Sequence, residues 1–193
     1  MRKLVFLSLA FITSLTFTSC KKGENDPAIS LKSRDARITG EWKLTNLSGD
    51  FIDRYENSDG TVSSYKQTLS YTDGKVTVTD QDGESQTFEF LLDLNLEKDQ
   101  NMTIYHYLNG DGSFEEYTHK DQWYWLDGVK KKTQIYLPGF NEITYLGYDD
   151  ALIVERLSDK ELHLRINTSS AMDDSYFGEE SQEYFILMEF EKE

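Results

Sequence analysis

Apolar and polar residues alternate with a period of two along most of the chain from Thr39 onward. The pattern is clearest in KVTVTD at 75–80, SQTFEFLLDLNL at 85–96 and NMTIYHYLN at 101–109. Such alternation places every second side chain on one face, as in a β-strand with one side on a core. Further strands are predicted from Thr39 and over 121–126, 133–137, 151–157, 161–166 and 183–190. Helical periodicity over eleven residues is absent from this part of the sequence.

Short turns join the predicted strands. Asp-Gly occurs at 59–60, 73–74, 82–83, 111–112 and 127–128, and Asn-Gly at 109–110. These dipeptides accommodate the positive φ angles of tight hairpins, so successive strands are predicted to pair antiparallel. A meander of this length would leave two unpaired edges unless it closed. The fold class predicted is all-β: an antiparallel meander closing into a barrel of about eight to ten strands.

One segment interrupts the alternation. Residues 167–182, NTSSAMDDSYFGEESQ, are polar and acidic. A stretch this long without an apolar period predicts a long surface loop. Asp80 to Glu84 faintly resembles a calcium loop, but Val78 stands where another acid is needed, so a hairpin turn is the interpretation we favour.

The first twenty residues have a different character. Arg2 and Lys3 precede an apolar run of about 14 residues at 4–17, shorter than the ~20 that a spanning helix needs. Thr18 and Ser19 then precede Cys20, the single cysteine of the chain. This order resembles a bacterial lipoprotein signal, which implies cleavage before Cys20 and acylation of its thiol. The alternative is an ordinary signal peptide with an incidental cysteine.

The residues after Cys20 are polar. The stretch 21–37, KKGENDPAISLKSRDAR, is interpreted as a tether with one helical turn at 33–37. It resembles the leader of lipoproteins that Bacteroidota carry to the cell surface, which implies an outer-membrane lipoprotein facing either the periplasm or the surface. The predicted organisation is a signal peptide at 1–19, the lipidated cysteine and tether at 20–37, and the barrel domain at 38–193.

Composition and charge limit the classes of partner that the chain is expected to bind. The chain has 20 Lys and Arg against 35 Asp and Glu, a formal net charge of −15. Such a charge disfavours nucleic acid and docking of the folded domain on anionic lipid. Aromatic residues make up 13% of the chain, which favours a packed fold over an acidic disordered one. We therefore expect a monomer that contacts the membrane through its lipid anchor.

The start of the barrel carries a family resemblance. Gly40-Glu41-Trp42 opens the first strand, and WYWLDG, KKKTQIYL and ALIVERLSDKELHLRI follow later. This arrangement resembles the lipocalin-like lipoproteins of Bacteroidota over roughly residues 38–190. The resemblance implies that Gly40 and Trp42 form a plug at one barrel end. It also implies that Arg156 or Arg165 covers the Trp42 ring by a cation–π contact.

No motif of a known reaction or phosphate loop is present, and no cofactor or enzymatic activity is predicted. The three histidines do not predict a metal site. A two-residue turn at Asp111-Gly112 places His106 opposite Tyr117 and His119 diagonal to His106, and a diagonal pair is ~7–8 Å apart. His163 alternates with two leucines and is predicted to be exposed.

The aromatic residues allow two interpretations. Most simply, they form the barrel core and plug. Alternatively Tyr105, His106, Trp123 and Trp125 line a pocket for a small apolar or amphiphilic ligand. The leading functional prediction is a membrane-anchored, non-catalytic lipocalin-like protein that binds such a ligand. The alternative is an envelope interaction module that docks a partner protein or glycan through its barrel end or acidic loop.

Overall fold

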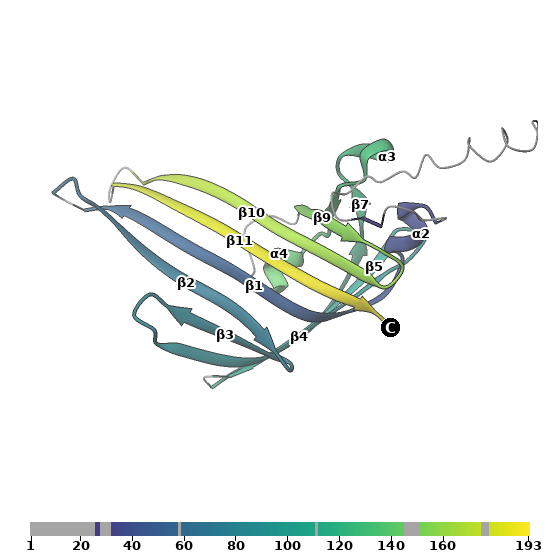
Figure 1. The fold of residues 1–193 in the computed structure, drawn as a ribbon, viewed down its shortest axis with the longest axis horizontal. Coiled ribbons are helices and arrows are strands. Elements are labelled where there is room, and N and C mark those ends of the chain that lie inside the picture. Colours follow the sequence, from purple (N-terminus) through teal and green to yellow (C-terminus); the bar gives the residue numbers. More distant parts are fainter. Residues whose placement is uncertain (1–25, 28–31, 58, 111, 145–150, 175–177) are drawn as a thin grey trace, which may run out of the picture.

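A computed structural model of the chain describes residues 26–27, 32–57, 59–110, 112–144, 151–174 and 178–193. Long strands run side by side along the molecule, with short helices at one end and beneath them (Figure 1). The helices are α2 (Arg34–Ile38), α3 (Gly128–Lys131) and α4 (Phe140–Thr144). The strands are β1 (Gly40–Glu56), β2 (Val62–Thr72), β3 (Lys75–Asp80), β4 (Ser85–Leu96), β5 (Asn101–Gly110), β6 (Ser113–Gln122), β7 (Tyr124–Trp125), β8 (Gln134–Tyr136), β9 (Ala151–Leu157), β10 (Glu161–Asp174) and β11 (Gly178–Lys192).

The strands form one antiparallel sheet that closes into a β-barrel with extra strands. Their order is β6-β5-β4-β3-β2-β1-β11-β10-β9-β8-β7, with a further pairing of β1 to β4. That pairing joins Gly40–Lys43 to Leu96–Asp93. The all-β meander is confirmed, and the fold is consistent with a lipocalin-like barrel. The described residues form eleven strands, more than predicted, because the sequence analysis did not predict β2 or most of β6.

Strand β1 holds the sheet together because it changes partner along its length. Its first residues pair with β4, its later ones, Ser48–Glu56, pair with β2, and β11 follows it from Trp42 to Tyr55. A shift in register between Leu44 and Asn46 bends the strand. The bend lets one strand belong both to the barrel and to the long ribbon that projects from it (Figure 1).

The long loop predicted over 167–182 is wrong. Strand β10 continues to Asp174, and β11 begins at Gly178, in an unbroken register from Asn167 opposite Phe185 to Asp174 opposite Gly178. Residues 175–177 lie outside the described part of the chain. Backbone hydrogen bonds alone pair the two strands, so the pairing does not require apolar alternation. The sequence pattern therefore missed it.

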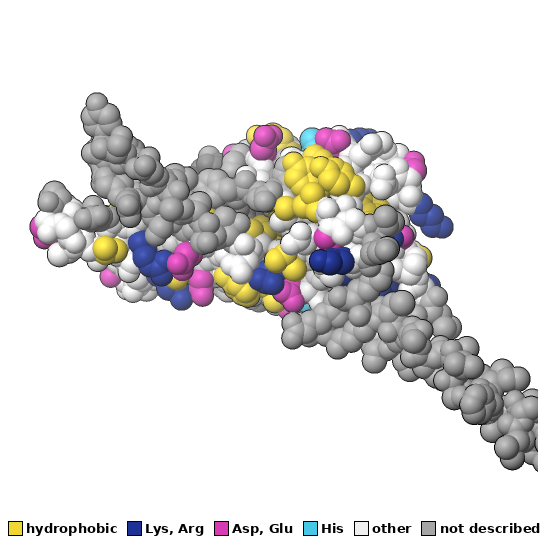
Figure 2. All heavy atoms as spheres, turned by 90° about the horizontal axis from the view of Figure 1, so that it is seen from above, with side chains coloured by type: hydrophobic (Ala, Val, Ile, Leu, Met, Phe, Trp, Pro, Cys, Tyr) yellow, Lys and Arg dark blue, Asp and Glu magenta, His cyan; other side chains and the backbone are white. Residues whose placement is uncertain are grey.

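The core lies where alternate residues of the strands meet, as the alternation predicts. It takes in Leu92, Leu94 and Leu96 of β4 and Met102 and Ile104 of β5, each at most 2% exposed. The other strands contribute Leu152, Val154, Leu162, Leu164, Ile186, Met188 and Phe190. One cluster thus stabilises the fold, in a chain with no second cysteine to form a disulfide. The outer surface is mainly polar, although Figure 2 shows a patch of hydrophobic side chains on the face seen from above.

The helical turn predicted at 33–37 is present as α2. The Ser33 hydroxyl accepts a hydrogen bond from the Ala36 amide at 3.2 Å and caps the helix. The expectation that this segment is a solvated tether needs correction, because Asp26, Arg34 and Arg37 are at most 5% exposed. The described part of the tether is packed on the barrel. Over all the described residues, no helix combines the length and apolar character required to cross a membrane.

Candidate functional site

A pocket of about 490 Å³ opens at the barrel end that carries α2. Three parts of the chain meet there: α2, the turn between β4 and β5, and the segment from the end of β6 through β7 to α3. The lining residues are Ser33, Asp35, Ala36, Thr39, Lys98, Asp99, Gln100, Trp123, Trp125 and Lys132. The pocket therefore combines two indole rings with a polar rim.

The two tryptophans are held by hydrogen bonds from both indole nitrogens. The rings of Trp123 and Trp125 are nearly perpendicular, with centroids 5.9 Å apart. Trp123 is 3% exposed, and its Nε1 donates to the Glu97 carbonyl at 3.1 Å. Trp125 is half-buried, and its Nε1 donates to Asp35 Oδ1 at 2.8 Å. Because both N–H groups are already engaged, the pair offers a ligand apolar ring surface rather than donors.

The rim of the pocket carries balanced charge. The Lys132 ammonium forms an ion pair with Asp35, and Lys98 and Asp99 are neighbours in the turn between β4 and β5. Asp99 is engaged in that turn, where Oδ2 accepts from the Asn101 amide nitrogen Nδ2 at 2.7 Å. Two cations and two carboxylates thus surround the tryptophans, in contrast to the strongly acidic chain as a whole.

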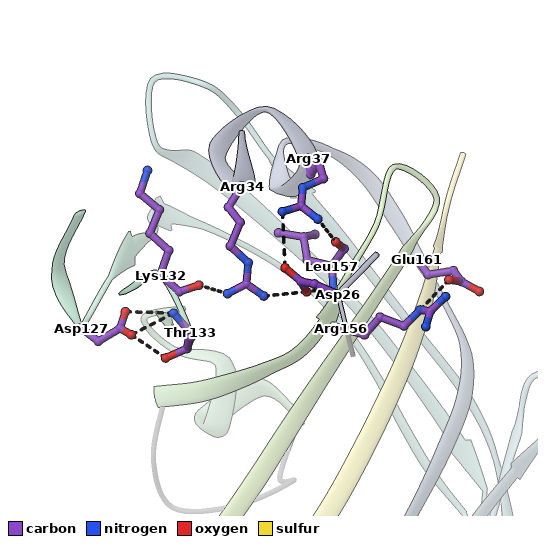
Figure 3. Close-up of polar contacts among 9 residues, drawn as sticks. All are labelled: Asp26, Arg34, Arg37, Asp127, Lys132, Thr133, Arg156, Leu157 and Glu161. Atoms are coloured by element: carbon purple, nitrogen blue, oxygen red, sulfur yellow. Dashed lines mark hydrogen bonds and ion pairs between the residues drawn. The ribbon is translucent and has the colours of Figure 1, made fainter. Parts of the chain in front are cut away.

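Asp26, Arg34 and Arg37 form a buried charge network beside the pocket, which we call the Asp26 clamp; Figure 3 shows its contacts. Asp26 Oδ1 accepts from Arg34 Nη2 at 3.0 Å and from the Leu157 amide at 2.9 Å. Its Oδ2 accepts from Arg37 Nη2 at 3.4 Å. Arg34 Nη1 donates to the Lys132 carbonyl, and Arg37 Nη1 donates to the Leu157 carbonyl. Burial lowers the pKa of Arg34, while Asp26 acts in the opposite direction.

The clamp contacts the tryptophan pocket directly. The Arg34 guanidinium carbon lies 5.9 Å from the centroid of the Trp125 ring. Nearby, Asp127 accepts from the amide of Thr133 at 2.9 Å and from its hydroxyl at 2.5 Å, which closes the loop around α3. Burial tends to raise the pKa of Asp127, but the hydrogen bonds from Thr133 outweigh it and the pKa is lowered. The backbone of Lys132 is therefore held on both sides.

The four predicted ligand-binding residues lie in three different places. Trp123 and Trp125 line the pocket together, whereas Tyr105 and His106 do not. His106 is fully buried in the core, with its ring 5.2 Å from that of Phe90. Tyr105 faces the other side of β5 and donates to Glu116 Oε1 at 3.3 Å. Adjacent residues of a strand point to opposite faces, so these two side chains cannot share a pocket.

His106 is unusual because it is buried without polar partners. Neither ring nitrogen has a hydrogen-bond partner in the described structure. Burial lowers its pKa, and the charge of Glu115 opposes that shift only in part. The predicted register is confirmed, with His106 opposite Tyr117, and His119 lies opposite Ile104. Among the described residues, no group of three or more His, Cys, Asp or Glu is arranged to hold a metal ion. His163 is half-buried, not exposed as predicted.

Trp42 is buried near the start of β1, and the cation over its ring is not an arginine. The side chain is 1% exposed, and Nε1 donates to the Ile38 carbonyl at 2.7 Å. The Lys192 ammonium lies 4.5 Å from the ring centroid. Gly40 has a φ of 140°, a backbone conformation that residues with a side chain rarely adopt, so glycine is favoured at this position.

The prediction of an arginine over Trp42 is wrong because both candidates have partners on their own hairpin. Arg156 Nε donates to Glu161 Oε2 at 2.7 Å, and Arg165 pairs with Glu155. The cation is instead Lys192, the last residue of β11, which lies opposite Trp42 in the sheet. Its ammonium also donates to the Arg37 and Thr39 carbonyls, at 2.9 and 2.6 Å.

Tyr105 contributes to a second, smaller pocket on the outer face of the barrel. This pocket has a volume of about 200 Å³, and Asp93 and Lys43 also line it. Burial raises the pKa of Asp93, while Lys43 lowers it to a lesser extent. Its volume is below the ~300 Å³ typical of small-molecule sites. The pocket with the two tryptophans is the better candidate.

The sequence did not reveal Asp26, Asp35, Arg34 or Lys132 as parts of the site. One signal was present: Arg34 and Arg37 are three residues apart, which places them on the same face of a helical turn. Cys20 lies outside the described residues. No protein-family model, no curated protein and no solved structure matches the chain. The fold itself defines an antiparallel β-barrel protein with a pocket at one end.

Proposed function

We propose that the protein is a non-catalytic, lipocalin-like binding protein that takes a small amphiphilic ligand in the pocket formed by Trp123 and Trp125. The observation that carries this proposal is the perpendicular tryptophan pair, whose rings line a pocket of about 490 Å³. That volume lies in the ~300–1,000 Å³ range of small-molecule sites, which combine apolar walls with a few polar groups.

The ligand would bind at the barrel end rather than deep inside the barrel. The interior is occupied by side chains such as Leu92, Ile104 and His106, all at most 1% exposed. An apolar part of the ligand would lie against the indole rings, where its burial is favourable. A polar part would reach the rim, where Lys98 and the Asp35–Lys132 pair offer charged groups of both signs.

The proposal includes a membrane anchor at Cys20. Its support is the sequence order of basic residues, a short apolar run and Thr18-Ser19-Cys20. Acylation would place the barrel at the outer membrane, and more than one acyl chain makes such an anchor stable. No catalytic role is proposed, because the site offers binding surfaces and balanced charge rather than a nucleophile with a base.

A fluorescence titration tests the binding proposal. A fatty-acid-like probe is added to the Cys20→Ser chain at low and at high ionic strength, and tryptophan emission is recorded. We expect saturable quenching in both buffers, because burial of apolar surface is not screened by salt. Trp125→Ala should weaken binding, whereas Tyr105→Phe, on the outer face of β5, should leave it unchanged. Absence of saturable quenching in both buffers refutes the proposal.

A second candidate is supported by the projecting ribbon of β1, β2, β10 and β11 (Figure 1). Tyr55, Val62 and Phe185 on these strands are 43%, 68% and 46% exposed. Exposed apolar residues of this kind would contribute to a contact with a partner if they formed one continuous patch. In this alternative the protein is an envelope interaction module. A partner retained with the native protein in mass spectrometry, together with a pocket that takes up no probe, would favour it.

A further inference from the structure

We propose that the Asp26 clamp holds the tryptophan-lined end of the barrel against the bilayer that anchors Cys20, so that the ligand is an amphiphile taken directly from the membrane. This inference rests on the proposed function, since it names the source and class of the ligand for the same pocket. The lipid bilayer is thus the surface that this end of the barrel faces.

The first argument is the length of chain between the anchor and the barrel. Asp26 is six residues after Cys20, and six extended residues span at most ~20 Å. A free tether that ended at Arg37 would instead include seventeen residues, with a reach of up to ~60 Å. Packing of Asp26 on the barrel therefore removes most of the reach that a free polar tether would have.

The second argument is that the clamp is buried and unfavourable to break. The side chains of Asp26 and Arg34 are each 1% exposed, and that of Arg37 is 4% exposed. The clamp joins α2 to the Leu157 backbone at the end of β9 and to the Lys132 backbone after α3. Release of Asp26 would leave two buried guanidinium groups without their carboxylate, which is strongly unfavourable. The point where the chain leaves for the anchor is thus fixed.

The third argument is the position of the pocket beside this point. Arg34 bonds both to Asp26 and to the Lys132 carbonyl, and it covers the Trp125 ring. Ser33, Asp35 and Ala36 of the same segment line the pocket. One short segment therefore carries both the exit toward the anchor and a wall of the binding site. A short anchor must bring the pocket near the lipid surface.

The surface chemistry of this end suits an interface with lipid. Tyr124 and Leu126 beside Trp125 are 43% and 42% exposed, and Tyr124 stacks on Tyr136 with ring centroids 5.0 Å apart. Lys98 lies at the rim. Tyrosine, tryptophan and lysine are favoured at the level of lipid headgroups. Because the rim pairs two cations with two carboxylates, an amphiphile with a neutral or zwitterionic headgroup fits better than an anionic one.

Quenching by brominated lipid tests the inference. The lipidated full chain is reconstituted in phosphatidylcholine vesicles with or without bromine on the acyl chains, and tryptophan emission is compared. Acyl bromine quenches indoles at short range, so wild type should lose emission in the brominated vesicles. The Trp123→Phe/Trp125→Phe double variant retains only Trp42, 1% exposed, and should lose little.

An insertion tests whether the bromine quenching depends on the short chain between Cys20 and the clamp or only on a general affinity of the protein for membranes. Twenty Gly/Ser residues placed between Gly23 and Glu24 add a root-mean-square span of about 25 Å and leave Asp26 in place. This variant should lose the bromine quenching. The same insertion at the Asp59-Gly60 turn, which leaves the anchor length unchanged, should keep it.

The inference is overturned if wild type shows no bromine quenching, or if the insertion before Glu24 leaves the quenching unchanged. A mass spectrum without acyl chains on Cys20 also overturns it. The probe titration of the Cys20→Ser chain in solution is read separately. Saturable probe binding without lipid quenching removes this inference and keeps the proposed function, whereas lipid quenching without probe binding removes the proposed function.

Discussion

Replacement of Trp42 by alanine should be the most costly change at the plug end of the barrel. The side chain is 1% exposed, and truncation of a buried large aromatic costs about 3–5 kcal/mol of unfolding free energy. Within that cost, the Ile38 carbonyl loses a donor at 2.7 Å, which contributes about 1–3 kcal/mol for a buried acceptor. The ring also loses the Lys192 ammonium at 4.5 Å, a contact worth about 0.5–2 kcal/mol.

Urea unfolding of the Cys20→Ser chain, followed by circular dichroism, measures these costs. Trp42→Phe keeps most of the ring but removes the N–H, so it should cost about 1–3 kcal/mol. A double-mutant cycle of Trp42→Phe with Lys192→Met reports the coupling of ring and cation. Lys43→Met is the matched control, because the Lys43 ammonium is exposed and 4.0 Å from Glu193, a surface pair worth less than ~1 kcal/mol. A cost below ~1 kcal/mol for Trp42→Ala would refute the structural role.

Two further predictions concern buried ionisable groups. Asp26→Ala should lower the unfolding free energy by about 3–5 kcal/mol, because it leaves Arg34 and Arg37 buried without their carboxylate. The control Asp50→Ala, at an exposed pair with Lys66, should cost less than ~1 kcal/mol. Equal urea midpoints for the two variants would contradict the structural role of the clamp. His106 has a lowered pKa in the folded state, so the unfolded chain binds its proton first and stability should fall as the pH drops below ~6.5. His106→Leu should remove this part of the pH dependence between pH 7.5 and 5.5, and parallel curves for variant and wild type would show that His106 is not the cause.

The strands that the sequence predicts well are those with one face on the core. The predicted range 75–80 matches β3, and 85–96 matches β4, residue for residue. From Phe90 to Leu96 in β4, apolar residues recur at every second position because those positions are buried, and in β3 Val76 is buried and Val78 packs against the core. In β2 burial also alternates, but Leu69 is the one fully buried residue, and the other inward positions are half-buried and mostly polar or tyrosine. A strand whose inner face is only half-buried does not need apolar residues there, so the sequence shows no apolar period.

The tryptophan pair could be predicted for the same reason. Trp123 and Trp125 are two residues apart, and both face the pocket at the barrel end. The same rule separates Tyr105 from His106, which are adjacent on β5 and therefore face opposite sides. Tyr105 and His106 therefore cannot line the same pocket, and strand geometry alone shows this. Periodicity thus assigns side chains to a face, but the pairing of distant strands decides which faces meet.

The Asp26 clamp cannot be predicted from the periodicity of the sequence. Asp26 is a charged residue in a polar stretch, and composition alone places it in solvent. Its burial depends on the Leu157 amide, 131 positions away, and on two arginines that themselves need the carbonyls of Leu157 and Lys132. The backbone partners are not identifiable until the barrel has formed, since main-chain amides and carbonyls leave no mark in a sequence. With Cys20 as the proposed anchor, this packing gives the segment after it a proposed role, because a polar stretch fixed on the barrel would set the orientation of the pocket and a free spacer would not.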